Sequence, residues 1–402
     1  MAQPRNLQRR WTILIGASLM GFAMYVPMLS IPPIIHIIAE ELFLSNAQVG
    51  LIFAAPLITL AILAIPSGTL SDKIGIKRAA GFGIIVIIVG SLLRGTATNF
   101  ITLLAFTVVY GAGWGLVYPN LPKLVGVWFP SERIGTATGI YTTVICIGCA
   151  LALGITLPMV YPITNTIQGV FYIWTIPAIV AAILWWIKVD ESPRRSTEAK
   201  RTGNSRSSSY KIWTNINLWL LASLFFVSNY AMYTWTGWAP QVMVTKGASP
   251  ELAALMTSAI FWACIPTMFI VPWVSDKIGL RKPFVWASFI LLFIASLSVI
   301  YVPLSLGWPI IVGAGLGLGV SFVMILTLLP EMVSVEAVGR ASGMVISIGY
   351  IGGLVGPWLA GYILDITKAL DLHLIILSGL SIIGIGLTFR IPDTGHKYRI
   401  NK

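Results

Sequence analysis

The sequence predicts an all-α membrane protein in which twelve transmembrane helices form two six-helix bundles. Three observations lead to this fold class. Of the 402 residues, 57% are hydrophobic and only 10% are charged, whereas a soluble domain has about 25% charged residues. Twelve apolar stretches are long enough to cross a bilayer, which takes about 20 residues. The second half of the chain also repeats the first half at a constant offset.

Each apolar stretch is expected to be a helix, because lipid offers no hydrogen bonds to unpaired backbone groups. The first stretch follows Arg5, Arg9 and Arg10 but is too long for a signal peptide, so we expect a retained helix. The predicted spans are 11–38, 46–69, 79–97, 100–128, 136–160, 167–187, 212–240, 251–274, 283–302, 306–330, 341–366 and 371–390.

The basic residues predict the orientation of the chain. With the N-terminus in the cytoplasm, all of the 26 Lys and Arg except Arg94, Lys246 and Lys368 fall on cytoplasmic segments. This asymmetry is the one that the positive-inside rule describes. We therefore expect an integral protein of the inner or plasma membrane with both termini cytoplasmic. The net charge of +12 then reports topology and attraction to anionic lipid, and not a nucleic-acid partner.

A short charged segment, Ser-Asp-Lys-Ile-Gly, occurs twice, at Ser71–Gly75 and again 204 residues later at Ser275–Gly279. At the same offset, Gly111, Gly113 and Gly115 correspond to Gly315, Gly317 and Gly319. The chain is therefore read as a parallel duplication. The predicted division is an N-terminal bundle (1–187), a polar cytoplasmic linker (188–211) rich in Ser, Arg and Lys, and a C-terminal bundle (212–402).

These features resemble the major facilitator superfamily of transporters. Gly68–Arg78 is similar to the loop between helices 2 and 3 of that superfamily, and Ser275–Lys282 falls where its second copy stands. The stretch Tyr110–Tyr141 further resembles the branch of nitrate, cyanate and small organic-anion carriers. The sequence departs from the superfamily pattern at Ile76, where an arginine is common. It also lacks the glutamine pair that sugar porters carry in helix 7.

The resemblance implies a cytoplasmic gate. Gly68 is expected to allow a close helix contact, and Asp72 to face the positive end of a neighbouring helix. Basic partners complete such a gate, and the alternative is that these charges only anchor the topology. The predicted gating residues are Gly68, Asp72, Arg78, Glu132, Arg133, Asp276 and Arg281.

In this fold, helices 1, 4, 7 and 10 line the central cavity, so polar and aromatic residues of these helices and of helices 5 and 11 are candidates for substrate contact. Tyr110, Trp114 and Tyr118 share one face because they are four residues apart. Helix packing is the alternative role for this stripe. The full set of candidates is Tyr25, Tyr110, Trp114, Tyr118, Asn120, Lys123, Tyr141, Asn229, Tyr230, Tyr233 and Tyr350.

The distribution of ionisable residues narrows the mechanism. No Asp, Glu or His lies near the middle of a predicted helix, which disfavours an ordinary proton-coupled carrier. Lys123 is the candidate anion site, with snorkelling to the cytoplasmic surface as its alternative. Arg94, at the outer end of a peripheral helix, is interpreted as structural. Cys146, Cys149 and Cys264 are expected to be free packing thiols.

The function predicted from these residues is that of a secondary active or facilitative transporter that moves a small organic solute, preferably an organic anion, by alternating access. No enzyme activity, cofactor or metal is expected, and we expect a monomer whose partners are the substrate and membrane lipid. Two alternatives stay open. One is an efflux carrier for amphipathic drug-like compounds, and the other is a membrane sensor that kept the carrier fold without transporting.

Overall fold

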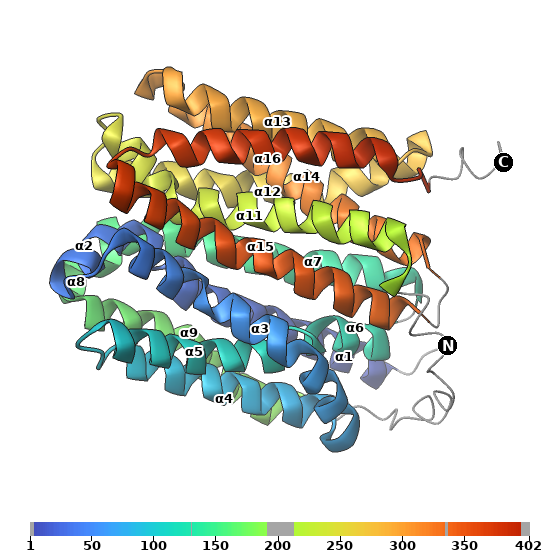
Figure 1. Cartoon of the computed structure of the whole chain (residues 1–402). Coiled ribbons are helices and arrows are strands. Elements are labelled where there is room, and N and C mark those ends of the chain that lie inside the picture. Colours follow the sequence, from blue (N-terminus) through green and yellow to red (C-terminus); the bar gives the residue numbers. More distant parts are fainter. Residues whose placement is uncertain (1–3, 130, 191–212, 334–336, 395–402) are drawn as a thin grey trace. The chain divides into compact units, whose positions relative to one another are not determined.

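The computed structural model describes residues 4–129, 131–190, 213–333 and 337–394, and these residues form helices and short connections without a strand (Figure 1). The side chains of residues 4–8, Ile65, Asp72, Ser131, Glu132 and Gly339 lie outside this description. Twelve helical segments are long and apolar enough to cross a membrane. The predicted fold class is therefore confirmed.

The chain divides into two compact units. Unit 1 comprises Met1–Leu44 and Ala55–Gly203, and unit 2 comprises Ser45–Ala54 and Asn204–Lys402. The helix α3 (Asn46–Ile74) therefore contributes its first part to unit 2 and the rest to unit 1. The domain boundaries predicted at residues 188 and 211 stay a prediction, because most of that linker lies outside the described residues.

Unit 1 contains six membrane-spanning segments, several of them built from two helices. Proline breaks the fourth and fifth segments, since a Pro-Asn step follows Tyr118 and Pro158 lies in a short π-helical turn. Besides α3, its helices are α1 (Pro4–Leu29), η1 (Pro32–Ile34), α2 (Ile35–Glu41), α4 (Ile76–Arg94), α5 (Phe100–Val117), α6 (Asn120–Trp128), α7 (Ser131–Ile155), η2 (Thr156–Val160), α8 (Tyr161–Thr164) and α9 (Ile167–Lys188).

Unit 2 contains the other six spans, each a single long helix. They are α11 (Ile216–Thr245), α12 (Pro250–Ile278), α13 (Lys282–Tyr301), α14 (Gly307–Glu331), preceded by the short η4 (Leu304–Leu306), α15 (Val338–Thr367) and α16 (Asp371–Arg390).

The two units repeat the same helix pairings. In unit 1, α1 packs on α7, α4 on α5, and α4 on α9; in unit 2, the corresponding pairs are α11 with α15, α13 with α14, and α13 with α16. The helices α3 and α12 also begin alike, because the hydroxyls of Ser45 and Ser249, 204 residues apart, each accept a backbone N–H at 3.2 Å. The internal repeat thus appears in the packing as well as in the sequence.

The repeated glycines lie where two helices approach each other closely. A Cβ on Gly115 would lie 2.6 Å from Cβ of Leu63 on α3, and one on Gly315 would lie 2.5 Å from the backbone carbonyl of Ile260 on α12. Such distances leave no room for a side chain. The small residues of α5 and α14 therefore allow the backbones to pack, as the sequence predicts for membrane helices.

The Ser-Asp-Lys-Ile-Gly segments differ from their prediction as charged turns. Ser71–Ile74 forms the last turn of α3, and Ser275–Ile278 forms the last turn of α12, so both helices run past the apolar stretches predicted for them. The chain turns only at Gly75 (φ 94°) and Gly279 (φ 74°). Glycine is required there because a positive φ is strained for residues with a Cβ. The charged residues are therefore held on rigid helix ends.

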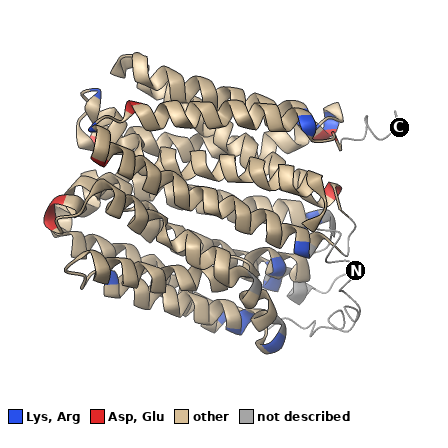
Figure 2. Cartoon of the chain, in the orientation of Figure 1, with Lys and Arg blue, Asp and Glu red and all other residues tan. Residues whose placement is uncertain are grey.

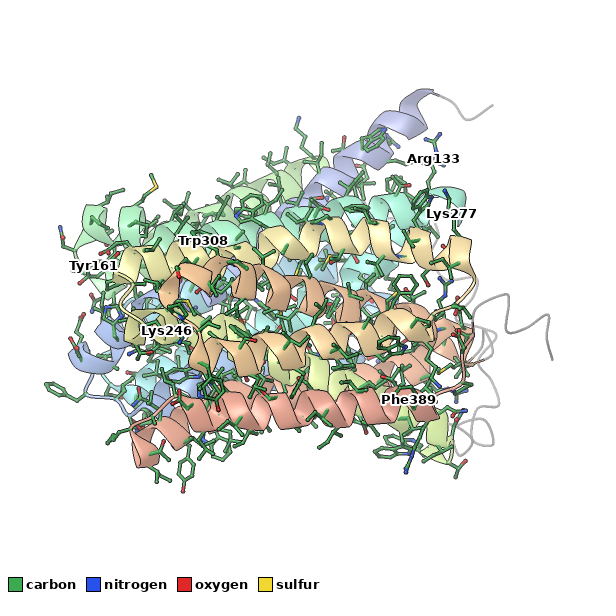
Figure 3. All side chains as sticks on the ribbon, turned by 90° about the horizontal axis from the view of Figure 1, so that it is seen from above. Arg133, Tyr161, Lys246, Lys277, Trp308 and Phe389 are labelled. Carbon is green, nitrogen blue, oxygen red and sulfur yellow. The ribbon has the colours of Figure 1, made fainter. Side chains whose placement is uncertain are left out.

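In each unit, most of the described Lys and Arg gather at one end of the helices (Figure 2). In unit 2, Lys277 and Phe389 lie at that end and Lys246 and Trp308 at the other; in unit 1, Arg133 and Tyr161 lie at opposite ends (Figure 3). The cytoplasmic assignment of the basic end follows from the positive-inside rule and stays a prediction.

One carboxylate explains why the start of α3 belongs to unit 2. Asp365 of α15 accepts hydrogen bonds from the backbone N–H groups of Asn46 at 2.9 Å and Ala47 at 2.8 Å, and from the Asn46 side chain at 2.8 Å. A carboxylate at a helix N-terminus neutralises the partial positive charge of unpaired N–H groups. Asp365 therefore caps α3, a role that the sequence did not reveal.

Candidate functional site

Three predicted substrate residues of unit 1 lie together around α1. The hydroxyl of Tyr110 and the indole Nε1 of Trp114 both donate to the backbone carbonyl of Met24, the latter at 2.5 Å. The Trp114 ring lies 4.3 Å from that of Tyr25. Tyr110 and Trp114 are fully buried, whereas Tyr25 is partly exposed. Tyr110 and Trp114 of α5 thus pack against α1 and use their polar atoms there, and Tyr25 of α1 is the accessible ring of the three.

Arg94 lies directly beneath this group and was not predicted as a site residue. Its side chain, only 1% exposed, donates from Nη1 to the carbonyl of Pro27 at 3.1 Å. The guanidinium centre lies 4.3 Å from the ring of Phe171 and 5.1 Å from that of Tyr110. Among the described residues, its Nε and Nη2 atoms are buried without a hydrogen-bond partner. The sequence shows a lone arginine at the end of an apolar span, which is a signal of function in membrane proteins. It does not show that this side chain is buried.

Of the remaining unit 1 candidates, Tyr118 and Asn120 lie where α5 meets α6, and Tyr141 lies on α7. Tyr141 of α7 is buried and Tyr118 is partly exposed. Asn120, at the start of α6, donates to the carbonyl of Leu116 at 2.7 Å and to the hydroxyl of Ser67 at 3.2 Å. Asn120 therefore connects α6 to α3, and substrate contact by these residues stays a prediction.

Lys123 lies at the first Ser-Asp-Lys-Ile-Gly segment. Its ammonium donates to the hydroxyl of Ser71 at 2.9 Å and approaches the carbonyl of Gly68 at 3.4 Å. The lysine thus extends toward the basic end of unit 1, as in the snorkelling alternative. A role as an anion site stays a prediction, and the contacts seen here are those of a structural link between α6 and α3.

The unit 2 candidates form an aromatic cluster. The ring of Tyr233 lies 6.4 Å from that of Tyr350 and 6.3 Å from that of Phe53, and Tyr350 lies 6.2 Å from Phe225. Tyr230 is buried, and its hydroxyl has no partner among the described residues. The amide of Asn229 donates to the carbonyl of Phe225 at 2.8 Å. The sequence therefore identified side chains that come together, and the tyrosine hydroxyls are the polar groups of this cluster.

The predicted gating residues of unit 2 form a charge cluster at the second Ser-Asp-Lys-Ile-Gly segment. Arg281 contacts Asp276 at 2.6 Å, Glu331 at 2.9 Å and the hydroxyl of Ser275 at 3.0 Å. Burial alone would lower the pKa of Arg281, but the hydrogen bonds and negative charges of Glu331 and Asp276 raise it. Arg281 therefore stays protonated and holds the ends of α12 and α14 together.

Two carboxylates of this cluster were not among the predicted site residues. Glu331 is the last residue of α14, and Asp393 accepts the backbone N–H groups of Arg281 at 3.0 Å and Lys282 at 3.2 Å. Asp393 thereby caps α13.

The predicted gate of unit 1 is described less completely. The side chains of Asp72 and Glu132 lie outside the described residues, and Arg78 is exposed. The close helix contact predicted at Gly68 is wrong in this structure, because a Cβ there would meet no atom within 4 Å. Gly68 instead offers its carbonyl to Ser71 at 2.8 Å.

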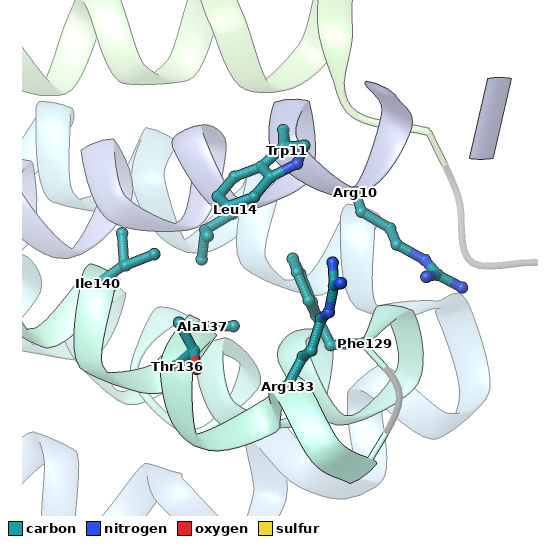
Figure 4. A pocket seen from close by; sticks show the side chains of 8 residues that line it. All are labelled: Arg10, Trp11, Leu14, Phe129, Arg133, Thr136, Ala137 and Ile140. Atoms are coloured by element: carbon teal, nitrogen blue, oxygen red, sulfur yellow. The ribbon is translucent and has the colours of Figure 1, made fainter. Parts of the chain in front are cut away.

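Arg133 lines an open pocket of about 200 Å³ in unit 1, between the beginning of α1 and the beginning of α7 (Figure 4). Arg10 provides a second guanidinium, and Trp11, Leu14, Phe129 and Ile140 provide apolar walls. Thus a residue predicted for gating lines a cavity with two cations, and its gating role stays a prediction.

The family follows from a comparison of the whole chain with known proteins. The family model of the Major Facilitator Superfamily matches residues 13–357 and 238–401. The chain belongs to this superfamily. Its helices superpose on the D-xylose–proton symporter with a TM-score of 0.78, at 15% identity and with 96% of this chain and 99% of that chain covered. At this identity the likeness concerns the fold.

Several curated relatives of this superfamily member span nearly the same length. The uncharacterized transporter YycB of Bacillus subtilis is 27% identical over 94% of this chain and 92% of the relative. The gentisate transporter of Corynebacterium glutamicum is 25% identical over 81% of this chain and 75% of the relative. The 2-nitroimidazole transporter of Escherichia coli is 23% identical over 89% of this chain and 89% of the relative. The protein is therefore a membrane transporter and not an enzyme.

Proposed function

We propose that this transporter moves small organic anions across the membrane by alternating access between its two units. Arg94 carries this proposal. It is the last residue of α4, at the end of a membrane span, and it is buried there with two N–H-bearing atoms left unpartnered among the described residues. Such a charge costs free energy and persists in membrane proteins mainly where it serves a function.

The surroundings of Arg94 favour attraction of negative charge. In the described helices, Asp and Glu stand only near helix ends, so no described carboxylate neutralises Arg94 within the span. A unit charge about 10 Å away in a medium of effective dielectric constant 20 attracts an anion by roughly 1–2 kcal/mol. Tyr110 and Trp114 connect the guanidinium to the partly exposed Tyr25, where a substrate would feel this field.

The relatives support the same substrate class. The gentisate transporter is named for an aromatic carboxylate, and the aromatic side chains of α1, α5, α11 and α15 suit a planar organic solute. The proposed substrate is therefore a small organic anion, with the charge attracted by unit 1 and the apolar part in contact with tyrosine and tryptophan rings.

Uptake into proteoliposomes tests this function. Purified protein is reconstituted, and entry of radiolabelled gentisate, cyanate, glucose and the amphipathic cation ethidium is measured. We expect saturable uptake of at least one anion and none of glucose. The variant Arg94→Gln keeps a donor for the Pro27 carbonyl but loses the charge, so anion uptake should fall at least tenfold, about what 1.4 kcal/mol corresponds to. The variant Lys188→Gln, at an exposed cation that ends α9 and belongs to no predicted site, serves as the matched control.

The second candidate is an efflux carrier for uncharged or amphipathic compounds. It is favoured by the similarity to the 2-nitroimidazole transporter and by the buried aromatic cluster of Tyr233 and Tyr350. Transport of ethidium with equal rates in wild type and Arg94→Gln, and no anion uptake, would overturn the anion proposal in favour of this one. Ligand binding without any flux would instead favour a sensor.

A further inference from the structure

The pocket between α1 and α7 has a chemical character that transport alone does not require. It is lined by two guanidiniums, Arg10 and Arg133, and none of its lining residues is acidic. Among the described residues neither arginine has an ion-pair partner; the neighbouring Arg9 contacts Asp190 at 3.5 Å. The pocket therefore presents unneutralised positive charge to whatever enters it.

The two arginines reach the pocket from different helices. In Figure 4 the side chain of Arg133 rises from α7 toward α1, and the side chain of Arg10 extends from α1 outward, away from Trp11 and Leu14. Arginine presents a planar fork of N–H donors that matches the oxygens of phosphate, and it is less strongly hydrated than lysine. Two such forks at one opening suit a phosphate group better than a single carboxylate.

The location of the pocket matches the boundary of a membrane. Arg10 lies near the start of α1, in the span Arg9–Glu41, and Arg133 lies in the first turn of α7 (Ser131–Ile155), where the second span begins. Trp11, 46% exposed, lies beside the cations, and Ile15, 58% exposed, follows one helical turn deeper into the span. Tryptophan is common at the level of lipid head groups. An exposed apolar stripe therefore continues from the charged rim into the hydrocarbon region.

We propose that this pocket binds an anionic phospholipid, with Arg10 and Arg133 holding the phosphate of the head group and an acyl chain lying along Trp11 and Ile15. Basic pockets between transmembrane helices on the positively charged side recognise lipid head groups in this way. The cations alone would accept free phosphate. The adjoining apolar stripe selects the lipid, because only a ligand with a chain gains from covering it.

Native mass spectrometry of the full-length protein in detergent tests the site. Phosphatidylglycerol, phosphatidylcholine or inorganic phosphate is added singly, and bound molecules are counted. We expect one tightly retained phosphatidylglycerol. In Arg10→Gln/Arg133→Gln its dissociation constant should rise about 30-fold, since each basic residue near an anionic lipid contributes roughly fivefold. Lys73→Gln/Arg78→Gln, which removes two cations of unit 1 at exposed positions, should change it less than about twofold.

Further variants separate the possible sources of the phosphate. Trp11→Ser with Ile15→Ser should weaken phosphatidylglycerol and leave inorganic phosphate unaffected. Inorganic phosphate that binds as tightly as phosphatidylglycerol would overturn the lipid proposal and leave a free-phosphate site. An equal loss of phosphatidylglycerol affinity in Arg10→Gln/Arg133→Gln and in Lys73→Gln/Arg78→Gln would overturn the site, because the lipid would then be held by general surface attraction. Size-exclusion profiles identify misfolded variants, and Arg10→Lys/Arg133→Lys, which keeps both charges, then replaces the glutamine pair and should show an intermediate loss.

Discussion

The two Ser-Asp-Lys-Ile-Gly segments are identical in sequence but are held in different ways. In unit 2, Ser275 accepts a hydrogen bond from Arg281, which comes from the same connection and also contacts Asp276 and Glu331. In unit 1, the corresponding Ser71 accepts a hydrogen bond from Lys123 of α6. The acceptor is thus the same in both units, whereas the cation comes from another part of the chain.

The position equivalent to Arg281 shows why the donors differ. That position is Lys77, whose ammonium instead approaches the carbonyl of Trp186 at 3.3 Å and the ring of the same residue at 5.9 Å. Lysine lacks the fork that lets Arg281 contact three partners at once. The duplication therefore preserved the serine and the helix end, while the supporting charge was supplied independently in each unit.

Replacing the arginine of unit 2 should give the largest effect. Arg281→Gln removes a side chain that is 11% exposed and leaves Glu331, 23% exposed, without its cation. A partly buried charged group without its partner costs about 2–3 kcal/mol. We expect a lower melting temperature by intrinsic fluorescence, together with slower transport. Lys77→Gln is the matched control in unit 1, and an equal effect of the two changes would contradict the comparison.

Replacing the lysine of unit 1 should give a smaller effect. Lys123→Met keeps the length and apolar contacts of the side chain but removes its hydrogen bonds to Ser71 and Gly68, which are worth about 1 kcal/mol. Melting should shift less than in Arg281→Gln. If anion uptake disappears while stability is unchanged, Lys123 contacts substrate as the sequence suggested, and its structural role is secondary.

A transplanted arginine sharpens the comparison. Lys77→Arg added to Lys123→Met places a forked cation at the position that Arg281 occupies in unit 2. If the two helix ends are equivalent, the arginine should recover about half of the lost stability, roughly 0.5 kcal/mol, in the same melting assay. No recovery would mean that the backbone of unit 1 directs position 77 only toward Trp186.

The serines themselves should give the smallest effect. Ser71→Ala and Ser275→Ala each remove one acceptor, and each should cost about 0.5–1 kcal/mol. Ser275→Ala is expected to be the milder change, because Arg281 keeps its two carboxylates. Chemical denaturation of the purified variants measures the difference, and the reverse order would show that Lys123 depends little on Ser71.

Much of this protein could be predicted because its signals are local. Lipid requires every spanning segment to be a helix, so hydrophobic length alone located the twelve spans. The repeat located the glycines where α5 and α14 approach their neighbours. Tyr233 and Tyr350 became candidates because they are polar aromatic residues of spans 7 and 11, and the structure brings their rings together, while their contact with substrate stays a prediction.

The rest required the tertiary structure, because it depends on partners distant in sequence. Asp365 caps a helix that begins at Asn46, and Lys123 finds Ser71 across a helix pair. No local pattern reports such distances. The burial of Arg94 against Phe171 likewise depends on a partner distant in sequence. The sequence by itself determined the helices, the duplication and the superfamily, since these follow from composition and periodicity; only the fold decided which charges meet, because that is a property of packing.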